Sequence, residues 1–321
     1  MKRGILHQAD YRPLFSGHET FPPRYGWLKK AYDSVALSDG DLGNRAIFLD
    51  DSAITRFGVG RNMVKSMRHW STACGVIAED EKTGQLTTTK LGDFLFGRNG
   101  VDPYLENPAS LWLLHWQLCS GENPRCLKTT WFWSINYFAG TTFQRKDLVE
   151  GLLRLAEQRG WPRVSQTTVQ RDVECFVRTY ENRINPDSGF VEDNLESIFS
   201  ELGLVKGSRA YFQFIRGEKY SIPDSVFVYA LSKFWDRQPS LNTLSYEAIA
   251  HEVGSPGRVL LLDEFAIADR LLAMEELTSG RLLWSETAGL RQALRPHPLV
   301  EDELFSLLKD TYAASRHVRN V

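Results

Sequence analysis

Two neighbouring residues near the N-terminus, His18 and Glu19, have side chains that can do chemistry on a phosphodiester. A histidine and a carboxylate can position a water molecule, or a divalent metal ion such as Mg²⁺ or Mn²⁺, beside a phosphate. Adjacent residues of an extended segment point to opposite sides, so the pair converges on one ion only in a bent loop. His18 and Glu19 are therefore candidate catalytic residues. The alternative, that both hold their loop in place by hydrogen bonds, stays open.

The remaining sequence contains no complete catalytic or metal-binding pattern. An acid followed by an acid-x-Lys is only half present, at Asp80-Glu81-Lys82, and the motifs GxxxxGK and GxSxG are absent. The cysteines form no CxxC pair, which argues against a disulfide framework and against a zinc ribbon. His115 and Cys119 would share one face of a helix, but no further ligand is evident, so ordinary burial is the expected role of both.

The segment that follows the His18–Glu19 pair predicts a helix whose start could bind an anion. Thr20 is a suitable N-cap, Pro22 and Pro23 suit a first helical turn, and residues 24–35 continue the helix. Its predicted inward residues are Trp27, Leu28, Ala31, Tyr32 and Val35. Backbone N–H groups at a helix start favour a phosphate. Basic side chains of the same segment add positive charge: Arg24, Lys29 and Lys30.

A second basic segment has the order of a helix-turn-helix. Residues 50–57 predict a short helix, residues 58–60 a turn with two glycines, and residues 61–73 a second helix. The predicted inward face of the second helix contains Val64, Met67, Trp70 and Cys74. Its opposite face contains Arg61, Lys65 and Arg68. No acidic residue occurs from Ser52 to Ile77, so this outer face could meet a DNA duplex.

A two-stranded wing is predicted after the basic helix. Residues 75–78 and 85–88 suit short strands around a polar turn, and Thr88 or Thr89 can cap a following helix. This order predicts a winged helix, which in other proteins can also serve only for packing. We expect Arg61, Asn62 and Lys65 to approach the major groove. The other predicted DNA-binding residues, which would contact phosphates, are Arg24, Lys29, Lys30, Arg68 and Arg171.

Two further segments repeat the plan of helix, turn and helix. In the first, residues 144–157 and 165–180 predict helices, and the second of these has a polar outer face that could read bases or simply be solvated. In the other, residues 246–253 and 263–277 predict helices and residues 282–285 a strand, followed by an amphipathic helix at 299–314. The 263–277 helix is acidic and would repel DNA, so we expect a protein contact or a structural role there.

Residues 110–139 are rich in aromatic side chains but contain few basic ones. A platform for single-stranded DNA needs both kinds, so a helical hairpin with a turn at 121–124 is the better prediction. The predicted fold is mainly α with small β wings, in which tandem winged-helix-like units are joined by this aromatic segment. The predicted domains are residues 1–105, 106–240 and 241–321.

Composition is consistent with an ordinary globular protein. The 321 residues have a net charge of -2, which excludes a uniformly basic coat for nucleic acid but not a local basic patch. The sequence has no apolar run of about 18 residues and no signal-peptide pattern at its start. We therefore expect a cytoplasmic protein that does not bind membranes.

Three stretches of sequence resemble a family of uncharacterised domains. They are residues 15–33 (FSGHETFPPRYGWLKKAYD), residues 57–77 (FGVGRNMVKSMRHWSTACGVI), and the late pair 255–264 (SPGRVLLLDE) and 284–292 (WSETAGLRQ). The family is that of the SspB-type DNA nickases of single-strand phosphorothioate modification and phage-defence systems. The resemblance implies a protein that binds duplex DNA and nicks one strand, so that sulfur can replace a nonbridging phosphate oxygen. It also implies three partners: a cysteine desulfurase, an ATPase and a sulfur transferase.

The resemblance does not assign catalytic residues, so a second function stays open. A noncatalytic winged-helix adaptor or regulator could recruit the sulfur-transfer enzymes to DNA. A protein-interaction scaffold without DNA binding would leave the basic helix at 61–73 unexplained. A homodimer is a further alternative that the sequence leaves open.

Overall fold

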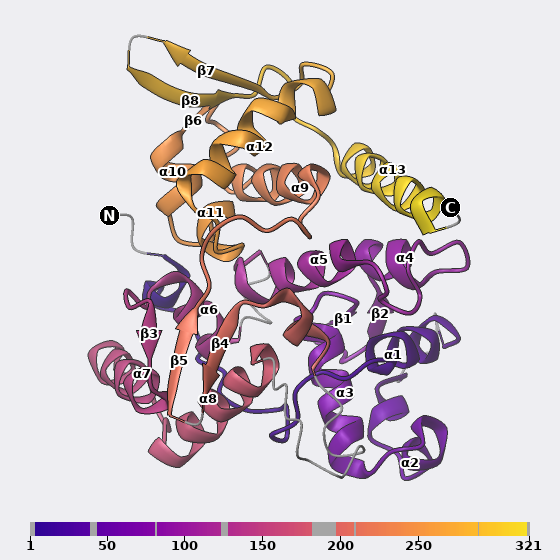
Figure 1. The fold of residues 1–321 in the computed structure, drawn as a ribbon. Coiled ribbons are helices and arrows are strands. Elements are labelled where there is room, and N and C mark those ends of the chain that lie inside the picture. The colour runs from indigo at the N-terminus through magenta and orange to yellow at the C-terminus, as the bar shows by residue number, and fades with distance from the viewer. Residues whose placement is uncertain are drawn as a thin grey trace.

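The computed structural model describes residues 4–38, 44–80, 82–122, 128–181, 197–208, 210–287 and 289–319. Within these ranges the chain is predominantly helical, with three small antiparallel sheets (Figure 1). This agrees with the predicted mainly α class with small β elements. No helix in the described ranges is both long enough and apolar enough to cross a membrane.

The N-terminal part contains helices α1 to α4 and the hairpin β1–β2. Its elements are η1 (Ile5–His7), α1 (Trp27–Ala36), η2 (Asn44–Phe48), α2 (Ser52–Phe57), α3 (Arg61–Ala73), β1 (Ile77–Glu79), β2 (Leu86–Thr88) and α4 (Lys90–Phe96). Helix α3 has the predicted bounds, and all four residues predicted to face inward are buried. Ile77 pairs with Thr88 in the hairpin, and the Thr89 side chain accepts a hydrogen bond from the Gly92 N–H at the start of α4. The predicted cap at Thr89 is confirmed.

The start of α1 differs from the prediction. Helix α1 begins at Trp27, after Gly26 with φ at +76°, and no side chain caps it. Thr20 has φ at +66° rather than the extended backbone of an N-cap, and Pro22 and Pro23 are buried in an irregular segment. Residues 16–20, called the 16–20 loop below, therefore do not lead directly into a helix start, and the prediction of a helix start at Thr20 is wrong. The predicted inward face of α1 is buried, as expected.

The middle of the chain supplies the most buried helices. Its elements are α5 (Pro108–Cys119), α6 (Thr129–Asn136), β3 (Thr142–Phe143), α7 (Arg145–Arg159), α8 (Gln166–Tyr180), η4 (Ile198–Leu202), β4 (Val205–Ser208), β5 (Tyr211–Phe214) and α9 (Asp224–Trp235). Helices α5 and α6 pack together as the expected hairpin, whose predicted turn lies partly outside the described residues. Helix α9 was not predicted, and it is buried on nearly all sides.

Helices α7 and α8 match the second predicted pair. Gln144 caps α7 in a capping box with Asp147, and Gly160, with φ at +61°, ends the helix. The Ser165 side chain accepts a hydrogen bond from the Thr168 N–H at the start of α8. The sheet beside this pair has the strand order β3-β5-β4, which places β5 between its two neighbours.

The C-terminal part was predicted less completely. Its elements are β6 (Thr243–Ser245), α10 (Tyr246–His251), α11 (Pro256–Val259), α12 (Glu264–Leu277), β7 (Leu283–Thr287), β8 (Leu290–Leu294) and α13 (Glu301–Arg319). The segment between the two predicted helices contains the short helix α11, and the predicted strand at 282–285 overlaps β7. The sheet order β6-β8-β7 adds two strands that the sequence analysis missed.

One hydrophobic core extends through all three parts of the chain. It contains residues from Phe15 to Tyr312, and α5 and α9 supply many of them. Helix α13 packs along α9 (Figure 1). Its aromatic residues Phe305 and Tyr312 contact Phe94 of α4. The Tyr312 hydroxyl lies 2.8 Å from the hydroxyl oxygen of Ser110. The division into three domains stays a prediction.

Candidate nucleic-acid interface

The 16–20 loop has an unusual backbone. Gly17, Glu19 and Thr20 all have positive φ angles, of +104°, +47° and +66°. Positive φ is uncommon for residues other than glycine, and two such residues in a row are found where the surroundings hold them in place. A hydrogen bond from the Phe21 N–H to the His18 carbonyl, at 2.8 Å, closes the turn. The loop is therefore the bent segment that the His18–Glu19 hypothesis required.

His18 anchors the loop to helix α8. Its side chain is only 3% exposed, and its Nε2 lies 2.7 Å from Oδ1 of Asp172, which is 1% exposed. The Thr20 N–H donates to Nδ1 of His18 at 3.0 Å, so Nδ1 is the unprotonated nitrogen. Nε2–H therefore donates to the Asp172 carboxylate. This arrangement fits the loop-holding role of His18, because no face of the ring is open to a substrate.

Further bonds fasten the loop between α3 and α8. On the α3 side, the indole N–H of Trp70 donates to the Phe21 carbonyl at 2.9 Å. On the α8 side, Arg178 donates to the Thr20 carbonyl at 3.1 Å. Glu19, whose side chain is about one-third exposed, lies 3.9 Å from the Lys65 ammonium of α3. The loop thus bridges two helices, and Glu19 is the member of the candidate pair that reaches solvent.

His69 packs directly against the loop from α3. A Cβ atom at Gly17 would lie only 2.4 Å from Nδ1 of His69, so the loop can approach this closely only with a glycine there. The His69 ring also packs edge-on against His18. Burial lowers the pKa of His69 well below its usual value, and the nearby charge of Lys128 lowers it further. His69 is therefore a neutral interior side chain and adds no positive charge to a DNA-binding face.

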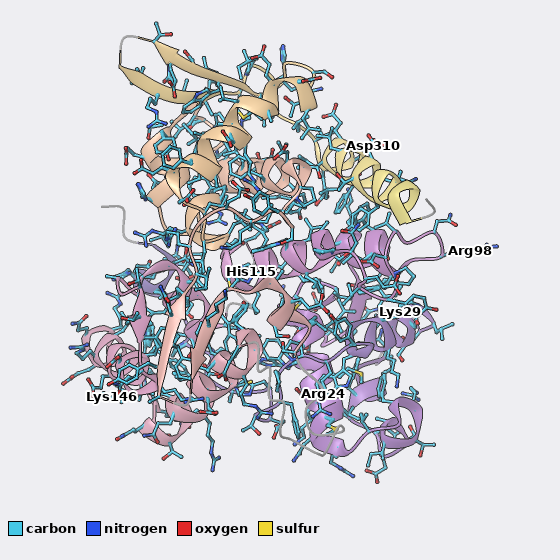
Figure 2. The ribbon with its side chains drawn as sticks, viewed as in Figure 1. Arg24, Lys29, Arg98, His115, Lys146 and Asp310 are labelled. Atoms are coloured by element: carbon cyan, nitrogen blue, oxygen red, sulfur yellow. The ribbon has the colours of Figure 1, made fainter. Side chains whose placement is uncertain are left out.

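Several predicted DNA-binding residues already have partners within the protein. Arg61 pairs with Asp51, Arg68 with Glu79, and Lys29 with Asp33. Lys30 donates to the carbonyl at the end of α2 at 3.2 Å, and the Arg24 guanidinium lies 5.7 Å from the ring centres of Phe21 and Trp27. Figure 2 shows Arg24 and Lys29 at separate places on this half of the molecule. These contacts weaken the case for a single phosphate-binding surface on α1.

Three predicted residues stay available at the surface. Asn62 on α3 and Arg171 on α8 are exposed, and Lys65 is about half exposed beside Glu19. Arg171 directly precedes Asp172, the partner of His18. The two helices that hold the 16–20 loop therefore each carry an exposed cation. The structure joins α3, the loop and α8 into one candidate interface, which the sequence analysis had treated as separate segments.

A family model described as "Protein of unknown function (DUF4007)" matches residues 15–312. The chain belongs to the DUF4007 family. Two solved structures resemble this DUF4007 chain, and each is 29% identical to it. "SspB crystal structure" has a TM-score of 0.82 and covers 98% of this chain and 92% of its own. "Magnesium ion-bound SspB crystal structure" has a TM-score of 0.81 and covers 96% of this chain and 90% of its own. No curated protein matches the chain.

In the described part of the DUF4007 chain, the donor atoms do not form a ready magnesium centre. Among the described residues, no group of three or more histidine, cysteine, aspartate and glutamate side chains could hold a metal ion. At the loop, one oxygen of Asp172 binds His18, and the other is buried without a hydrogen-bond partner in the described part of the chain. Glu19 offers one carboxylate. Magnesium usually takes several waters and substrate oxygens besides one or two carboxylates. The loop alone therefore does not form a magnesium site.

Asp172 and Arg178 are the residues of this site that the sequence analysis of the DUF4007 chain missed. Asp172 lies on the buried face of α8, between Val169 and Phe176 in helical spacing. A carboxylate on an apolar stripe needs a partner, because burying an unpaired charge costs several kcal/mol or more. The position of Asp172 on an apolar stripe was therefore the one signal in the sequence that could have pointed to this residue. The sequence could not identify His18 as the partner.

His115 and Cys119 are buried in the core of the DUF4007 chain, as expected. The Nδ1 atom of His115 lies 2.8 Å from the Tyr180 hydroxyl, and Nε2 lies 2.8 Å from the Val259 carbonyl. Since Nε2 donates to that carbonyl, Nδ1 accepts from the tyrosine. Burial lowers the pKa of His115 to about 4. Figure 2 shows His115 near the centre of the molecule, where it joins α5 to α8 and α11.

Proposed function

We propose that this chain is the DNA-binding component of a bacterial DNA phosphorothioation system that defends against phage. It binds duplex DNA and nicks one strand to allow sulfur incorporation. The observation that carries the proposal is the likeness to the SspB structures over 98% of the chain, at a TM-score of 0.82. The proposed nicking activity rests on the resemblance of the three sequence stretches to SspB-type nickases.

The order of elements supports a winged-helix mode of DNA binding. Helix α2, a turn and α3 are followed by the antiparallel hairpin β1–β2, which is the order of such a unit. In this mode α3 enters the major groove with Asn62 and Lys65, while Arg171 of α8 contacts a phosphate beside it. Arg61 joins them only if the DNA displaces Asp51 from it.

The 16–20 loop is the proposed place of cleavage. Glu19 is the candidate that touches the reacting atoms, because its carboxylate reaches solvent beside Lys65. It positions or deprotonates the attacking water. His18 acts by holding the bent loop through Asp172. Were Mg²⁺ or Mn²⁺ to take part, Glu19 would be the residue of the loop to hold it and the ion would polarise the phosphodiester; the magnesium-bound SspB structure supports this metal class.

The proposed protein partners are a cysteine desulfurase, an ATPase and a sulfur transferase. The outer face of α12 is a suitable contact for one of them, because it is acidic and unsuited to DNA. Its exposed acids are Glu264, Asp269, Glu275 and Glu276. The proposed setting is the cytoplasm, and a homodimer is a further proposal.

A noncatalytic adaptor that recruits the sulfur-transfer enzymes is the second candidate. The burial of His18 favours it, as does the absence of a three-donor metal cluster among the described residues. Both functions need the interface of α3 and α8, but only nicking needs Glu19.

Incubation of supercoiled plasmid with the purified protein separates these functions. Open-circle product and DNA binding are measured together, in Mg²⁺, in Mn²⁺ and in EDTA, with and without the partner proteins. A nickase gives metal-dependent open circle, and Glu19→Gln suppresses nicking while it spares binding. Glu150→Gln, on the exposed face of α7, is the matched control. Binding without open circle under every condition supports the adaptor. Absence of salt-dependent binding removes both candidates.

A further inference from the structure

A cavity of about 690 Å³ lies away from the 16–20 loop and is built from other elements. Its walls come from the end of α6 and the segment after it, from the residues that follow β5, and from α10 and α11. A volume of this size can enclose a small organic ligand, for which pockets of about 300–1,000 Å³ are usual. Neither DNA binding by α3 nor cleavage at Glu19 uses it.

Two arginines lie at one end of the cavity. Arg216, His251 and Arg258 also line an adjoining cavity of about 340 Å³, so they form the boundary between the two. Arg216 donates to the carbonyls of Gly257 and Leu262 at 3.1 and 3.0 Å, and Nε of Arg258 donates to the His251 carbonyl at 2.6 Å. Backbone contacts therefore fix both guanidinium groups in position.

The two guanidinium groups have donors to spare. Each presents five N–H groups, and the contacts above use only part of them. Neither arginine has a carboxylate within ion-pair distance in the described part of the chain. Burial lowers the pKa of Arg216, the positive charge of Arg258 lowers it further, and the negative charge of Asp263 offsets part of this effect. An anion between the two groups would relieve this repulsion and accept their remaining hydrogen bonds.

The cavity also has aromatic side chains in its lining, which suit a planar ring. Tyr137 and Phe138 line it together with Phe214 of β5, and the rings of Phe138 and Phe214 have centres 6.2 Å apart. Ser134 also lines it and is only 2% exposed, and its hydroxyl has no hydrogen-bond partner among the described residues. A buried hydroxyl without a partner is unfavourable, and a polar edge of a ligand would satisfy it.

The carboxylates of the lining are compatible with a sugar. Glu247 lies 3.8 Å from His251, one turn further along α10. Glu252 has no such neighbour within ion-pair distance in the described part of the chain and lines the same cavity. Carboxylates accept hydrogen bonds from hydroxyl groups and repel a phosphate.

We propose that this cavity binds a nucleoside 5′-phosphate, with its base at Tyr137 and Phe138 and its phosphate at Arg216 and Arg258. The inference goes beyond the proposed function, since it concerns a separate site. The same chemical group occurs in a free mononucleotide and at the phosphorylated 5′ end of a DNA strand. The binding experiment distinguishes these two sources.

Calorimetric titration of the full chain tests the proposal with four compounds. They are deoxyadenosine 5′-monophosphate, deoxyadenosine, and a short single-stranded oligodeoxynucleotide with and without its 5′-phosphate. In at least one of the two pairs, the mononucleotide pair or the oligonucleotide pair, the compound with the phosphate binds. Its counterpart without the phosphate binds at least about tenfold more weakly, because one or two charge-assisted hydrogen bonds are lost. Binding of the mononucleotide indicates a free nucleotide. Binding of the phosphorylated oligonucleotide alone indicates a DNA end.

Two variants locate the binding. Arg258→Gln weakens it at least about tenfold. Ala139→Trp blocks it by filling the cavity from an exposed position, where no existing hydrogen bond is lost. The melting temperature checks that both variants fold, and Arg154→Gln on the exposed face of α7 is the charge control. The proposal is overturned if no compound binds, if the phosphate makes no difference, or if Ala139→Trp binds like the parent. Ala139→Trp leaves duplex binding through α3 unchanged, so failure here is distinct from failure of the proposed function.

Discussion

His18 donates a hydrogen bond to Asp172 across 154 residues of sequence, and this contact ties the 16–20 loop to helix α8. Both side chains are buried, so each depends on the other for its polar contacts. The bond also places Glu19 beside Lys65 at the surface. The shape of the candidate interface therefore depends on two residues that lie inside the protein.

Replacement of Asp172 by alanine should lower the free energy of unfolding by about 1–3 kcal/mol, because it leaves the His18 N–H buried without an acceptor. Asp172→Asn should recover part of the loss, since its amide oxygen can accept the same bond. Denaturant unfolding measures both. Gln170→Ala, at an exposed position of the same helix, should stay within about 0.5 kcal/mol of the parent. Equal stabilities of the Asp172→Ala and Gln170→Ala variants would contradict the proposed anchor.

Gly17→Ala should destabilise the protein by at least about 1 kcal/mol more than Gly26→Ala does. Both glycines have positive φ, but a Cβ at Gly17 meets His69 at 2.4 Å, whereas a Cβ at Gly26 has no atom within 4 Å. The difference between the two melting curves thus isolates the clash from the backbone strain. If the two variants melt together, the close packing of the loop against His69 is wrong.

The salt dependence of duplex binding should distinguish the cations of the α3–α8 interface from a cation of α1. Each phosphate contact contributes about one unit to the slope of log K against log salt concentration. Lys65→Ala and Arg171→Ala should each reduce this slope by about one. Lys29→Ala should leave it nearly unchanged, because Asp33 already pairs with that ammonium.

Fluorescence anisotropy of one labelled duplex, over a range of salt concentrations, measures these slopes. Arg154→Ala is the control for loss of a positive charge elsewhere on the surface. If the slope falls for Lys29→Ala but stays the same for Lys65→Ala, DNA binds at α1 and not at the α3–α8 interface.

The stability of the protein should fall as the pH falls from about 6.5 towards 4. Burial lowers the pKa of His115 to about 4 in the folded state, so below about 6.5 the unfolded chain binds a proton that the folded chain does not. When this pKa difference takes its full effect, the free energy of unfolding is lower by roughly 3 kcal/mol. His69, whose pKa is also lowered, acts in the same direction.

Unfolding free energies of the parent and of His115→Gln at several pH values above 4.5 test this effect. The variant is less stable at neutral pH, since it loses contacts to Tyr180 and Val259, but its stability should vary less with pH. A parallel pH dependence of the two proteins would show that His115 is not the group responsible.

Helices with one apolar face could be predicted from sequence. The bounds of α3 and the positions of α7 and α8 follow from local patterns, namely glycine turns and apolar residues at helical spacing. Helix α9 could not be recognised in this way, because its residues are buried on nearly all sides and no polar face marks the helical period.

The start of α1 and the candidate site show two other limits. Thr20, Pro22 and Pro23 have the pattern of a helix start, but the loop is held instead by tertiary contacts to α3 and α8. The residues Glu19 and Lys65 were predicted, and their approach to α8 was not. Hydrogen bonds between residues far apart in sequence leave no local pattern, so Asp172 and Arg178 could be found only in the folded chain.

Helix α13 closes over surfaces made much earlier in the chain. Its residues contact Phe94 and Ser110, and Glu301 and Asp302 form ion pairs with Lys90. During synthesis on the ribosome, these surfaces must therefore stay uncovered until residues 301–313 have emerged. For that period the growing chain exposes an aromatic patch that sticks readily to other chains. Chaperones that bind apolar surface would have their target in this interval, and the docking of α13 would end it.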